Sequence, residues 1–469
     1  MSCFFTLGWR YFELMEETPT LERLIRKYDV PVPRYTSYPT VPHWNVQDFN
    51  PESWQDAVKR SFDESNDEKG ISLYVHLPFC ESLCTYCACN TRITRNHAVE
   101  ERYITTLLSE WNAYLKLFGK RPIVRELHLG GGTPTFFSPE NLDRLLTALL
   151  ETADIHPEHE FGFEGHPNNT TGAHLEVLRA LGFRRVSFGV QDLDERVQKA
   201  INRIQPFHNV ERVTRLSRDL GYSSISFDLI FGLPYQTLIS ITNTIEKVIS
   251  LRPDRIAFYS YAHVPWLRPG QRGYEDADLP SDVAKRALYE QGRKMFEDAG
   301  YIEIGMDHFA LSHDALARAR YDGTLHRNFM GYTTTHTDLL IGLGASSISD
   351  AKYAYAQNEK VVEKYTQLVS DQRLAVYRGH IQSPDNMLRR KAILDIACRG
   401  VLSGDVLHMI ADQGTIVRLT EMEMEGLVTL TEDALIVTDL GRAFIRNICA
   451  VLDPHLAHGQ TSNIFSKAI

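Results

Sequence analysis

The chain has 469 residues, of which 43% are hydrophobic and 23% are charged, and its formal net charge is -10 at pH 7. This length allows one large α/β domain with a smaller one, and the composition is that of an ordinary globular protein. The negative charge argues against nucleic-acid binding. The sequence contains no run of about 18 apolar residues, which a membrane-spanning helix would need, and its first ten residues lack the basic segment of a signal peptide. We therefore expect a cytoplasmic protein.

Short β-branched or aromatic runs alternate with helical patterns between residues 71 and 261. The expected strands are residues 71–77, 124–129, 160–163, 185–190, 224–230 and 255–261, and the expected helices are residues 100–118, 138–152, 171–181, 210–220 and 238–251. This alternation indicates repeated βα units with a parallel sheet. We expect a partial or complete (β/α) barrel rather than an open doubly wound sheet, because polar residues and prolines mark the C-terminal ends of nearly every strand.

The character of the sequence changes after about residue 360. Helix-forming residues dominate from there on, and two short apolar runs, residues 426–430 and 434–438, flank a Glu-Asp turn. We therefore expect a mainly helical C-terminal domain with a small wing that covers the mouth of the barrel. The expected divisions are residues 1–50, an extension that includes a substrate-site segment, 51–360, the catalytic barrel, and 361–469, the covering domain.

Four of the seven cysteines fall within ten residues, directly after the first expected strand; they are Cys80, Cys84, Cys87 and Cys89. Three thiolates spaced C-x3-C-x2-C on a short loop can occupy three corners of an iron–sulfur cubane, and the fourth iron is then open unless Cys89 closes it. Disulfides fit poorly because the other three cysteines are scattered, and zinc would need a second pair of ligands. The loop therefore predicts an iron–sulfur cluster.

Further polar or glycine-rich segments follow the other expected strands. The run Gly130 to Thr135 comes between a strand and a helix, so its backbone can approach a ligand closely, although such a run is more often only a tight turn. Glu164, Gln191, Arg203 and Asp228 lie at or after the ends of successive strands. Gathered at one mouth, they could hold ribose hydroxyls, an ammonium group and a carboxylate; individually, each is more often a satisfied structural group.

Other segments of the chain complete a set of motifs. They are residues 33–40, 74–80, 130–135, 189–192, 228–234, 305–310 and 326–334. Together with the cysteine loop, they closely resemble the oxygen-independent coproporphyrinogen III oxidases, radical S-adenosylmethionine (SAM) enzymes of haem biosynthesis. The resemblance begins at about Leu24, and we expect residues 1–14, which precede Met15, to be dispensable. Two positions depart from the family pattern: His166, where an acid is usual, and Met330, where glutamine is common.

The resemblance implies a set of cofactor contacts. Cys80, Cys84 and Cys87 would hold one 4Fe–4S cluster, whose open iron binds SAM, and Cys89 would not be a ligand. The family is unusual in holding two SAM molecules. The residues expected at the first are Tyr74, Gly131, Glu164 and Ile348, and those expected at the second are Tyr86, Gly132, Thr133, Gln191, Arg203, Asp228 and Ala262.

The resemblance also implies the reaction. A 5'-deoxyadenosyl radical would abstract hydrogen from the propionate β-carbon, and loss of CO2 and of one electron would leave a vinyl group. Two such rounds convert coproporphyrinogen III into protoporphyrinogen IX. We expect Cys89 to take part in catalysis and Arg34 and Arg327 to bind propionates, since guanidinium grips carboxylates in bidentate fashion. The expected partners are a reductant such as flavodoxin or ferredoxin and an unidentified electron acceptor, and the chain is expected to be a monomer.

Two related functions compete with this one. A radical SAM relative can serve as a haem-binding chaperone, and another kind uses the same radical to open the porphyrin ring. The chaperones typically lack the C-x-C cysteine and the segment of residues 34–40, and both features are present here. The sequence therefore favours the oxidase.

Overall fold

The computed structural model describes residues 21–46, 49–456, 465 and 467. The chain divides into two compact units, one formed by residues 39–387 and the other by residues 1–38 together with 388–469. Residues 1–14, which we expect to be dispensable, lie outside the described residues. The divisions expected after residues 50 and 360 stay a prediction.

The larger unit is built on one sheet of twelve strands, in the order β16-β15-β14-β13-β1-β4-β5-β6-β7-β8-β10-β9. The parallel strands are β13 (Leu340–Leu343), β1 (Ile71–Leu77), β4 (Ile123–Gly131), β5 (Asp154–Gly165), β6 (Arg185–Gln191), β7 (Ser224–Phe231) and β8 (Arg255–Ser260). The antiparallel strands are β14 (Ile348–Asp350), β15 (Ala354–Asn358), β16 (Val376–Ile381), β10 (His308–Leu311) and β9 (Tyr301–Gly305). The parallel sheet is confirmed, and among the described residues no pairing between β16 and β9 closes it into a complete barrel.

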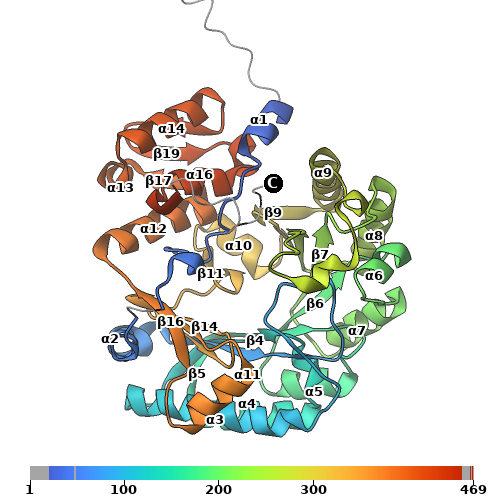
Figure 1. Ribbon diagram of the computed structural model, residues 1–469, viewed down its shortest axis with the longest axis vertical. Coiled ribbons are helices and arrows are strands. Elements are labelled where there is room, and N and C mark those ends of the chain that lie inside the picture. The colour runs from blue at the N-terminus through green and yellow to red at the C-terminus, as the bar shows by residue number, and fades with distance from the viewer. Residues whose placement is uncertain (1–20, 47–48, 457–464, 466, 468–469) are drawn as a thin grey trace, which may run out of the picture. The chain divides into compact units, whose positions relative to one another are not determined.

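Helices follow most of the parallel strands, as the βα pattern predicts. They are α2 (Pro51–Lys69), α3 (Val99–Phe118), α4 (Pro139–Leu150), α5 (Gly172–Ala180), α6 (Glu195–Ala200), α7 (Phe207–Asp219), α8 (Leu238–Leu251), α9 (Asp282–Asp298), α10 (Ala315–Tyr321) and α11 (Val362–Ser370). Several begin at a side chain that caps the helix, as Ser138 does by accepting from the backbone N–H of Asn141. Neighbouring helices contact one another, and Figure 1 shows α3, α4 and α5 along one side of β4 and β5.

The core lies between these helices and the sheet. The inward faces of β1 and β4 supply fully buried aliphatic side chains such as Val75 and Leu129, and α3 contributes Trp111. Burial of such side chains is the main favourable contribution to folding. Because the strands are parallel and in register, with Leu77 of β1 beside Gly131 of β4, their C-terminal ends meet at one edge.

The smaller unit is mainly helical. Its helices are α1 (Leu21–Tyr28), the greater part of α12 (Pro384–Arg399), α13 (Gly404–Ile410), α14 (Gln413–Met424), α15 (Asp439–Arg442) and α16 (Ile445–Val451). The predicted wing is confirmed as the antiparallel pair β18 (Val428–Leu430) and β19 (Ala434–Val437), and a third strand that the sequence did not predict, β17 (Val401–Ser403), joins β19. Tyr35 donates a hydrogen bond to Asp453 at 3.1 Å, which ties the segment after α1 to the end of the chain.

No helix in the described part of the chain is both long and apolar enough to cross a membrane.

Candidate active site

A cavity of about 520 Å³ opens at the edge where the parallel strands end. Its walls are the loop between β2 (Phe79–Cys80) and β3 (Arg92–Ile93) and the C-terminal ends of β4 to β7. The structure brings twelve of the predicted site residues to this cavity: Cys80, Cys84, Tyr86, Cys87, Cys89, Gly131, Gly132, Thr133, Glu164, Gln191, Arg203 and Asp228.

The cysteine loop, residues 80–91, is fixed at its base and along its length. At the base, β2 and β3 pair in parallel, and the N–H of Thr94 donates to the carbonyl of Cys80 at 2.9 Å. Farther along, the N–H of Thr85 donates to the carbonyl of Ile201, and the amide of Asn202 donates to the carbonyl of Leu83 at 2.7 Å. The segment after α6 therefore holds the loop over the cavity.

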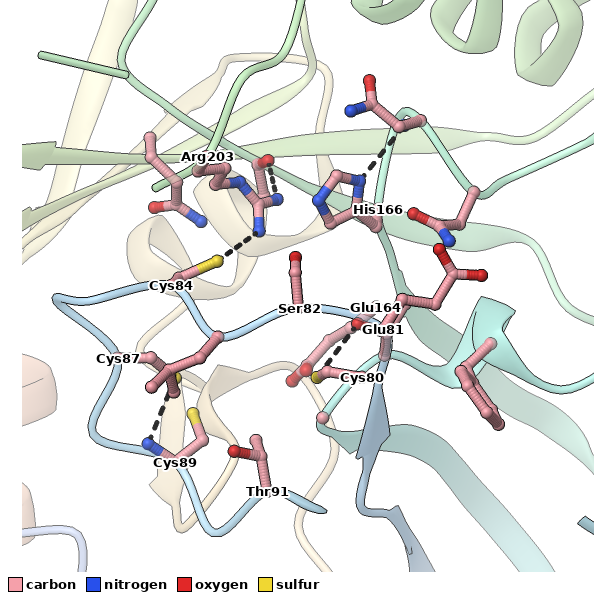
Figure 2. A pocket seen from close by; sticks show the side chains of 18 of the residues that line it. Cys80, Glu81, Ser82, Cys84, Cys87, Cys89, Thr91, Glu164, His166 and Arg203 are labelled. Atoms are coloured by element: carbon pink, nitrogen blue, oxygen red, sulfur yellow. Dashed lines mark hydrogen bonds between the residues drawn. The ribbon is translucent and has the colours of Figure 1, made fainter. Parts of the chain in front are cut away.

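Each of the three predicted ligand sulfurs has its own hydrogen-bonding partner (Figure 2). Cys80 Sγ lies 3.3 Å from Thr133 Oγ1, Arg203 Nη1 donates to Cys84 Sγ at 3.6 Å, and the N–H of Cys89 donates to Cys87 Sγ at 3.4 Å. Among the described residues, no three His, Cys, Asp or Glu side chains are grouped as a metal site, but the three thiols line one cavity.

Burial and neighbouring groups set the thiols apart. Burial raises the pKa of Cys80 to about 11, whereas a side-chain hydrogen bond from the thiol of Cys89 lowers the pKa of Cys87 to about 6. This bond between the two thiols, followed by burial, raises the pKa of Cys89 well above its ordinary value. Arg203 is positioned to balance thiolate charge, and its buried Nε has no hydrogen-bond partner among the described residues. Three thiol donors beside an uncommitted guanidinium N–H suit an iron–sulfur cluster and an anionic ligand.

The glycine run after β4 forms a wall of bare backbone. Gly131 has a φ of +116°, and a Cβ there would lie 2.8 Å from the ring of His76. A Cβ on Gly132 would lie 2.6 Å from the carbonyl oxygen of Pro78, while the N–H of Gly132 donates to the carbonyl of Leu77 at 2.9 Å. Only glycine allows this close approach between β4 and the start of the cysteine loop.

Acidic and amide side chains line another side of the cavity. Burial, with the nearby charge of Glu164, raises the pKa of Asp228 to about 7, and Ser187 Oγ donates to Asp228 Oδ1 at 3.1 Å. Gln191 has a φ of +66° at an irregularity in the pairing of β6 with β7. Such an irregularity re-aims side chains near functional sites, and here it accompanies a glutamine at the cavity.

Five predicted site residues do not line this cavity. On β1, Tyr74 stacks on the ring of His128, with the ring centroids 6.1 Å apart. The carbonyl of Ala262 lies close to the loop, because Gln271 Nε2 donates to it and to the carbonyl of Tyr86, both at 3.2 Å. The other three are Ile348 on β14, Arg327, which is buried with its guanidinium 4.7 Å from the ring centre of Tyr332, and Arg34, which belongs to the smaller unit.

His166, which the sequence marked only as a departure from the family pattern, also lines the cavity. His166 Nδ1 accepts from the N–H of Asn168 at 3.1 Å, and burial together with the charge of Arg203 lowers the pKa of His166 well below its ordinary value. A neutral imidazole is therefore the expected form. Its position two residues after Glu164, just beyond β5, was the available signal. Sequence reasoning missed Asn168, Asn169 and Tyr259, which line the cavity too.

Comparison with known proteins places these features in a family. The model of the radical SAM superfamily matches residues 74–248. The oxygen-independent coproporphyrinogen III oxidase of Salmonella typhimurium is 38% identical over 453 residues, which cover 95% of this chain and 98% of the relative. The enzyme of the same name from Synechocystis is 35% identical over 465 residues, which cover 96% and 99% of the two chains.

A solved structure gives the same result. It is coproporphyrinogen III oxidase from Escherichia coli, a radical SAM enzyme, which matches with a TM-score of 0.85 and 38% identity over 90% of this chain and 98% of that one. Radical SAM enzymes hold a 4Fe–4S cluster and SAM, which agrees with the donors gathered at the cavity. Similarity that extends over almost the whole length of both chains shows that this protein belongs to the oxygen-independent coproporphyrinogen III oxidase family of radical SAM enzymes.

Proposed function

We propose that the chain catalyses the anaerobic oxidative decarboxylation of two propionate groups of coproporphyrinogen III to vinyl groups, giving protoporphyrinogen IX. Relatives named oxygen-independent coproporphyrinogen III oxidase match nearly the full chain. The observation that carries the proposal is that one cavity joins all four cysteines of the loop to the polar ends of β5, β6 and β7.

In this proposal Cys80, Cys84 and Cys87 hold the cluster. When bound, the cluster and SAM supply one electron and a 5'-deoxyadenosyl radical that takes a hydrogen atom from the substrate. Arg203, which donates to Cys84 Sγ, offsets negative charge at the thiolates. The backbone of Gly131 and the carboxylate of Glu164, both at the cavity, bind the first SAM. The family resemblance adds Tyr74 and Ile348 as further contacts.

A second SAM molecule would use the residues on the other side of the cavity. Gly132 and Thr133 offer backbone, and the side chains of Gln191, Arg203 and Asp228 offer hydrogen-bond donors and acceptors there. Tyr86 and Ala262 complete this group, and their carbonyls are held by the same Gln271 amide. Support for the assignment comes from the guanidinium of Arg203, whose charge reaches Asp228 and lowers the pKa of that carboxyl, against the larger effect of burial.

Three side chains are proposed to act on the substrate. Cys89 lies beside Cys87 at the cavity, where its N–H donates to Cys87 Sγ at 3.4 Å. The thiol of Cys89 could transfer hydrogen to or from a ligand there. Arg327 and Arg34 are proposed to bind propionates, and both are able to form bidentate hydrogen bonds with carboxylates.

The test is a product assay under anaerobic conditions. The reconstituted protein is incubated with SAM, dithionite and coproporphyrinogen III, and the tetrapyrroles are then separated by chromatography. We expect protoporphyrinogen IX from the unchanged protein and none from Cys84→Ser. A protein that binds haem tightly but forms no vinyl product would instead be a haem chaperone, and an opened ring in the presence of haem would identify a haem-utilising enzyme; either result overturns the proposal.

The partners follow from the chemistry. Each SAM cleavage consumes one electron, so a low-potential carrier such as flavodoxin or ferredoxin is the proposed donor. The electron left after CO2 is lost requires an acceptor, whose identity is open. We propose that the chain works as a monomer, and its mass in solution tests this.

A further inference from the structure

Three cations from separate segments gather beside the cysteine loop, outside the cavity described above. The guanidinium of Arg268 donates to the carbonyl of Ala88, and the amide of Asn90 donates to the carbonyl of Lys360 at 2.9 Å. Arg378 lies in β16, opposite Gln357 of β15. Lys360 and Arg378 each lie 5.9 Å from the ring centroid of Tyr377, and the charges of both Arg378 and Arg268 act on Lys360. We call them the cation group.

The topology explains why these segments meet at the loop. Strand β13 is parallel to β1, β14 is antiparallel to β13, and β15 is antiparallel to β14, so β15 runs in the same direction as β1. The end of β15 and the start of β16 therefore lie at the edge where the cysteine loop begins. The sheet thus carries two of the three cations to the edge that holds the cavity.

The cation group has no carboxylate partner among the described residues, since none of its members forms an ion pair there. Burial, followed by the charges of Arg378 and Arg268, lowers the pKa of Lys360. Glu359 opposes this effect, but its Oε1 already accepts from the N–H groups of Lys360 and Val361. Burial also lowers the pKa of Arg378, whose Nε donates to Gln357 at 2.8 Å. Cations that repel one another are stabilised when an anion binds between them.

We infer that Arg268, Lys360 and Arg378 form a carboxylate-binding site that holds propionates of the tetrapyrrole that do not react. This inference rests on the proposed function. Coproporphyrinogen III carries four propionates, and while one reaches the cavity the others must be held outside it. The cation group adjoins Ala88 and Asn90, the residues on either side of Cys89, so it lies at the required place.

This assignment differs from the arginines that the sequence suggested. The guanidinium of Arg327 lies over the ring of Tyr332, and Arg34 belongs to the other unit. Lys360 and Arg378 belong to the larger unit, and each lies farther from an aromatic ring, 5.9 Å from the centroid of Tyr377. An acidic electron-carrier protein could use the same charges, and Trp266 is exposed near Arg268 in the chain. Lys360 is exposed, but Arg268 and Arg378 are half-buried, and this favours the smaller ligand, because a flat protein interface reaches fully exposed cations more readily.

The experiment uses Lys360→Gln and Arg378→Gln, with Lys364→Gln as a control that removes the same charge from an exposed position on α11. Arg268 is left unchanged because it also holds Ala88. Binding of coproporphyrin III, with four carboxylates, and mesoporphyrin IX, with two, is followed by fluorescence on the full reconstituted protein. Turnover of coproporphyrinogen III is measured with dithionite and with reduced flavodoxin, and thermal unfolding checks that each variant is folded.

Loss of one charge-assisted hydrogen bond should raise the Kd for coproporphyrin III and the KM for coproporphyrinogen III about tenfold, with kcat almost unchanged under either reductant. The Kd for mesoporphyrin IX should change less, and Lys364→Gln should behave as the unchanged protein. Unchanged tetracarboxylate binding in both variants and in the double variant would overturn the inference. Normal binding with activity lost only with flavodoxin would overturn it too, and would assign the cation group to an electron carrier.

The same data separate this inference from the proposed function. If the unchanged protein binds coproporphyrin III through Lys360 and Arg378 but forms no protoporphyrinogen IX, the carboxylate site stands and the proposed reaction fails. If the protein forms product and the variants bind and turn over normally, the reaction stands and the carboxylate site is wrong.

Discussion

Two carboxyl groups of the larger unit, Asp228 and Glu110, have pKa values raised to about 7, in each case mainly by burial. Their surroundings differ. Glu110 on α3 accepts from the N–H of Gly344 at 2.8 Å, the amide of Asn358 at 2.6 Å and the hydroxyl of Tyr365 at 2.7 Å. Asp228 lies at the cavity, where the hydroxyl of Ser187 donates to it. A raised pKa therefore does not mark a functional group by itself; acceptor atoms left for a ligand at a cavity do.

The cysteines show the same contrast. Cys80, Cys84 and Cys87 line the cavity, whereas Cys398 and Cys449 are buried in the smaller unit, the latter with its Sγ 3.8 Å from the carbonyl of Ile393. Buried cysteines generally act as small apolar side chains, while exposed thiols beside cations are reactive. The same substitution made at a residue of the cavity and at a buried residue of the core tests whether only the cavity residue serves function.

The largest effect is expected for the predicted ligands. Replacement of Cys80, Cys84 or Cys87 by Ser should leave less than about a tenth of the iron and no detectable SAM cleavage, because the cubane depends on thiolate ligands. Cys398→Ser and Cys449→Ser should keep both. Iron quantitation and anaerobic 5'-deoxyadenosine analysis measure the outcomes. A folded Cys398→Ser protein without iron would contradict the assignment.

The Cys89→Ser variant should separate the binding of the cluster from the formation of product. If Cys89 serves the substrate side rather than an iron, the variant keeps its iron and its visible spectrum, while product formation falls about a hundredfold, since serine lacks the oxidisable sulfur. Iron and tetrapyrrole products are measured on one preparation. Equal loss of iron and of activity would make Cys89 a ligand, and unchanged activity would remove it from the mechanism.

Substitution of Glu110 should affect the stability of the protein, whereas substitution of Asp228 should affect SAM binding. Glu110→Gln places an amide among three donors and should lower the free energy of unfolding by about 1–3 kcal/mol, with SAM affinity unchanged. Asp228→Asn should leave the thermal midpoint within a few degrees but weaken SAM binding about tenfold. Calorimetry and equilibrium SAM binding measure the pair. The contrast fails if Glu110→Gln loses SAM binding while it stays stable.

The pH dependence of stability sharpens this test. The folded-state pKa of Glu110 is about 7 against an ordinary value of 4.5, so between these pH values the folded protein keeps a proton that the unfolded chain has lost. Stability therefore falls as pH rises from 4.5 to 7, by about 3 kcal/mol from this group. Denaturant unfolding should show a smaller fall for Glu110→Gln, and an identical pH profile would contradict the raised pKa.

The strands with strong periodicity were predictable and the others were not. Residues 71–77 and 238–251 match β1 and α8 in full, because a strand with six of its seven residues buried and a capped helix leave clear patterns. The central strand β13 was missed, since its four residues, Leu340–Leu343, are too few to show a period. The edge strands β14 to β16 were missed because short antiparallel strands depend on neighbours distant in sequence.

The candidate site was predictable where chemistry is concentrated in sequence. The cysteine loop and the strand-end residues Glu164 and Asp228 were found because a parallel sheet brings strand ends together. His166 was noticed only as a departure from the family pattern, because its low pKa depends on burial and on Arg203, and the cation group could not be found, because its members become neighbours only after folding. The family resemblance supplied the division of the cavity into two SAM sites, which the geometry alone does not make.

The central claim is that SAM bound at this cavity takes hydrogen from the propionate side chains. The most direct test supplies coproporphyrinogen III deuterated at the propionate β-carbons to the reconstituted protein under anaerobic conditions, with mass spectrometry of the products. We predict deuterium in 5'-deoxyadenosine, with about two labelled molecules for each protoporphyrinogen IX formed. Vinyl product formed without deuterium in 5'-deoxyadenosine, or labelled substrate left unchanged while SAM is cleaved, would contradict the account.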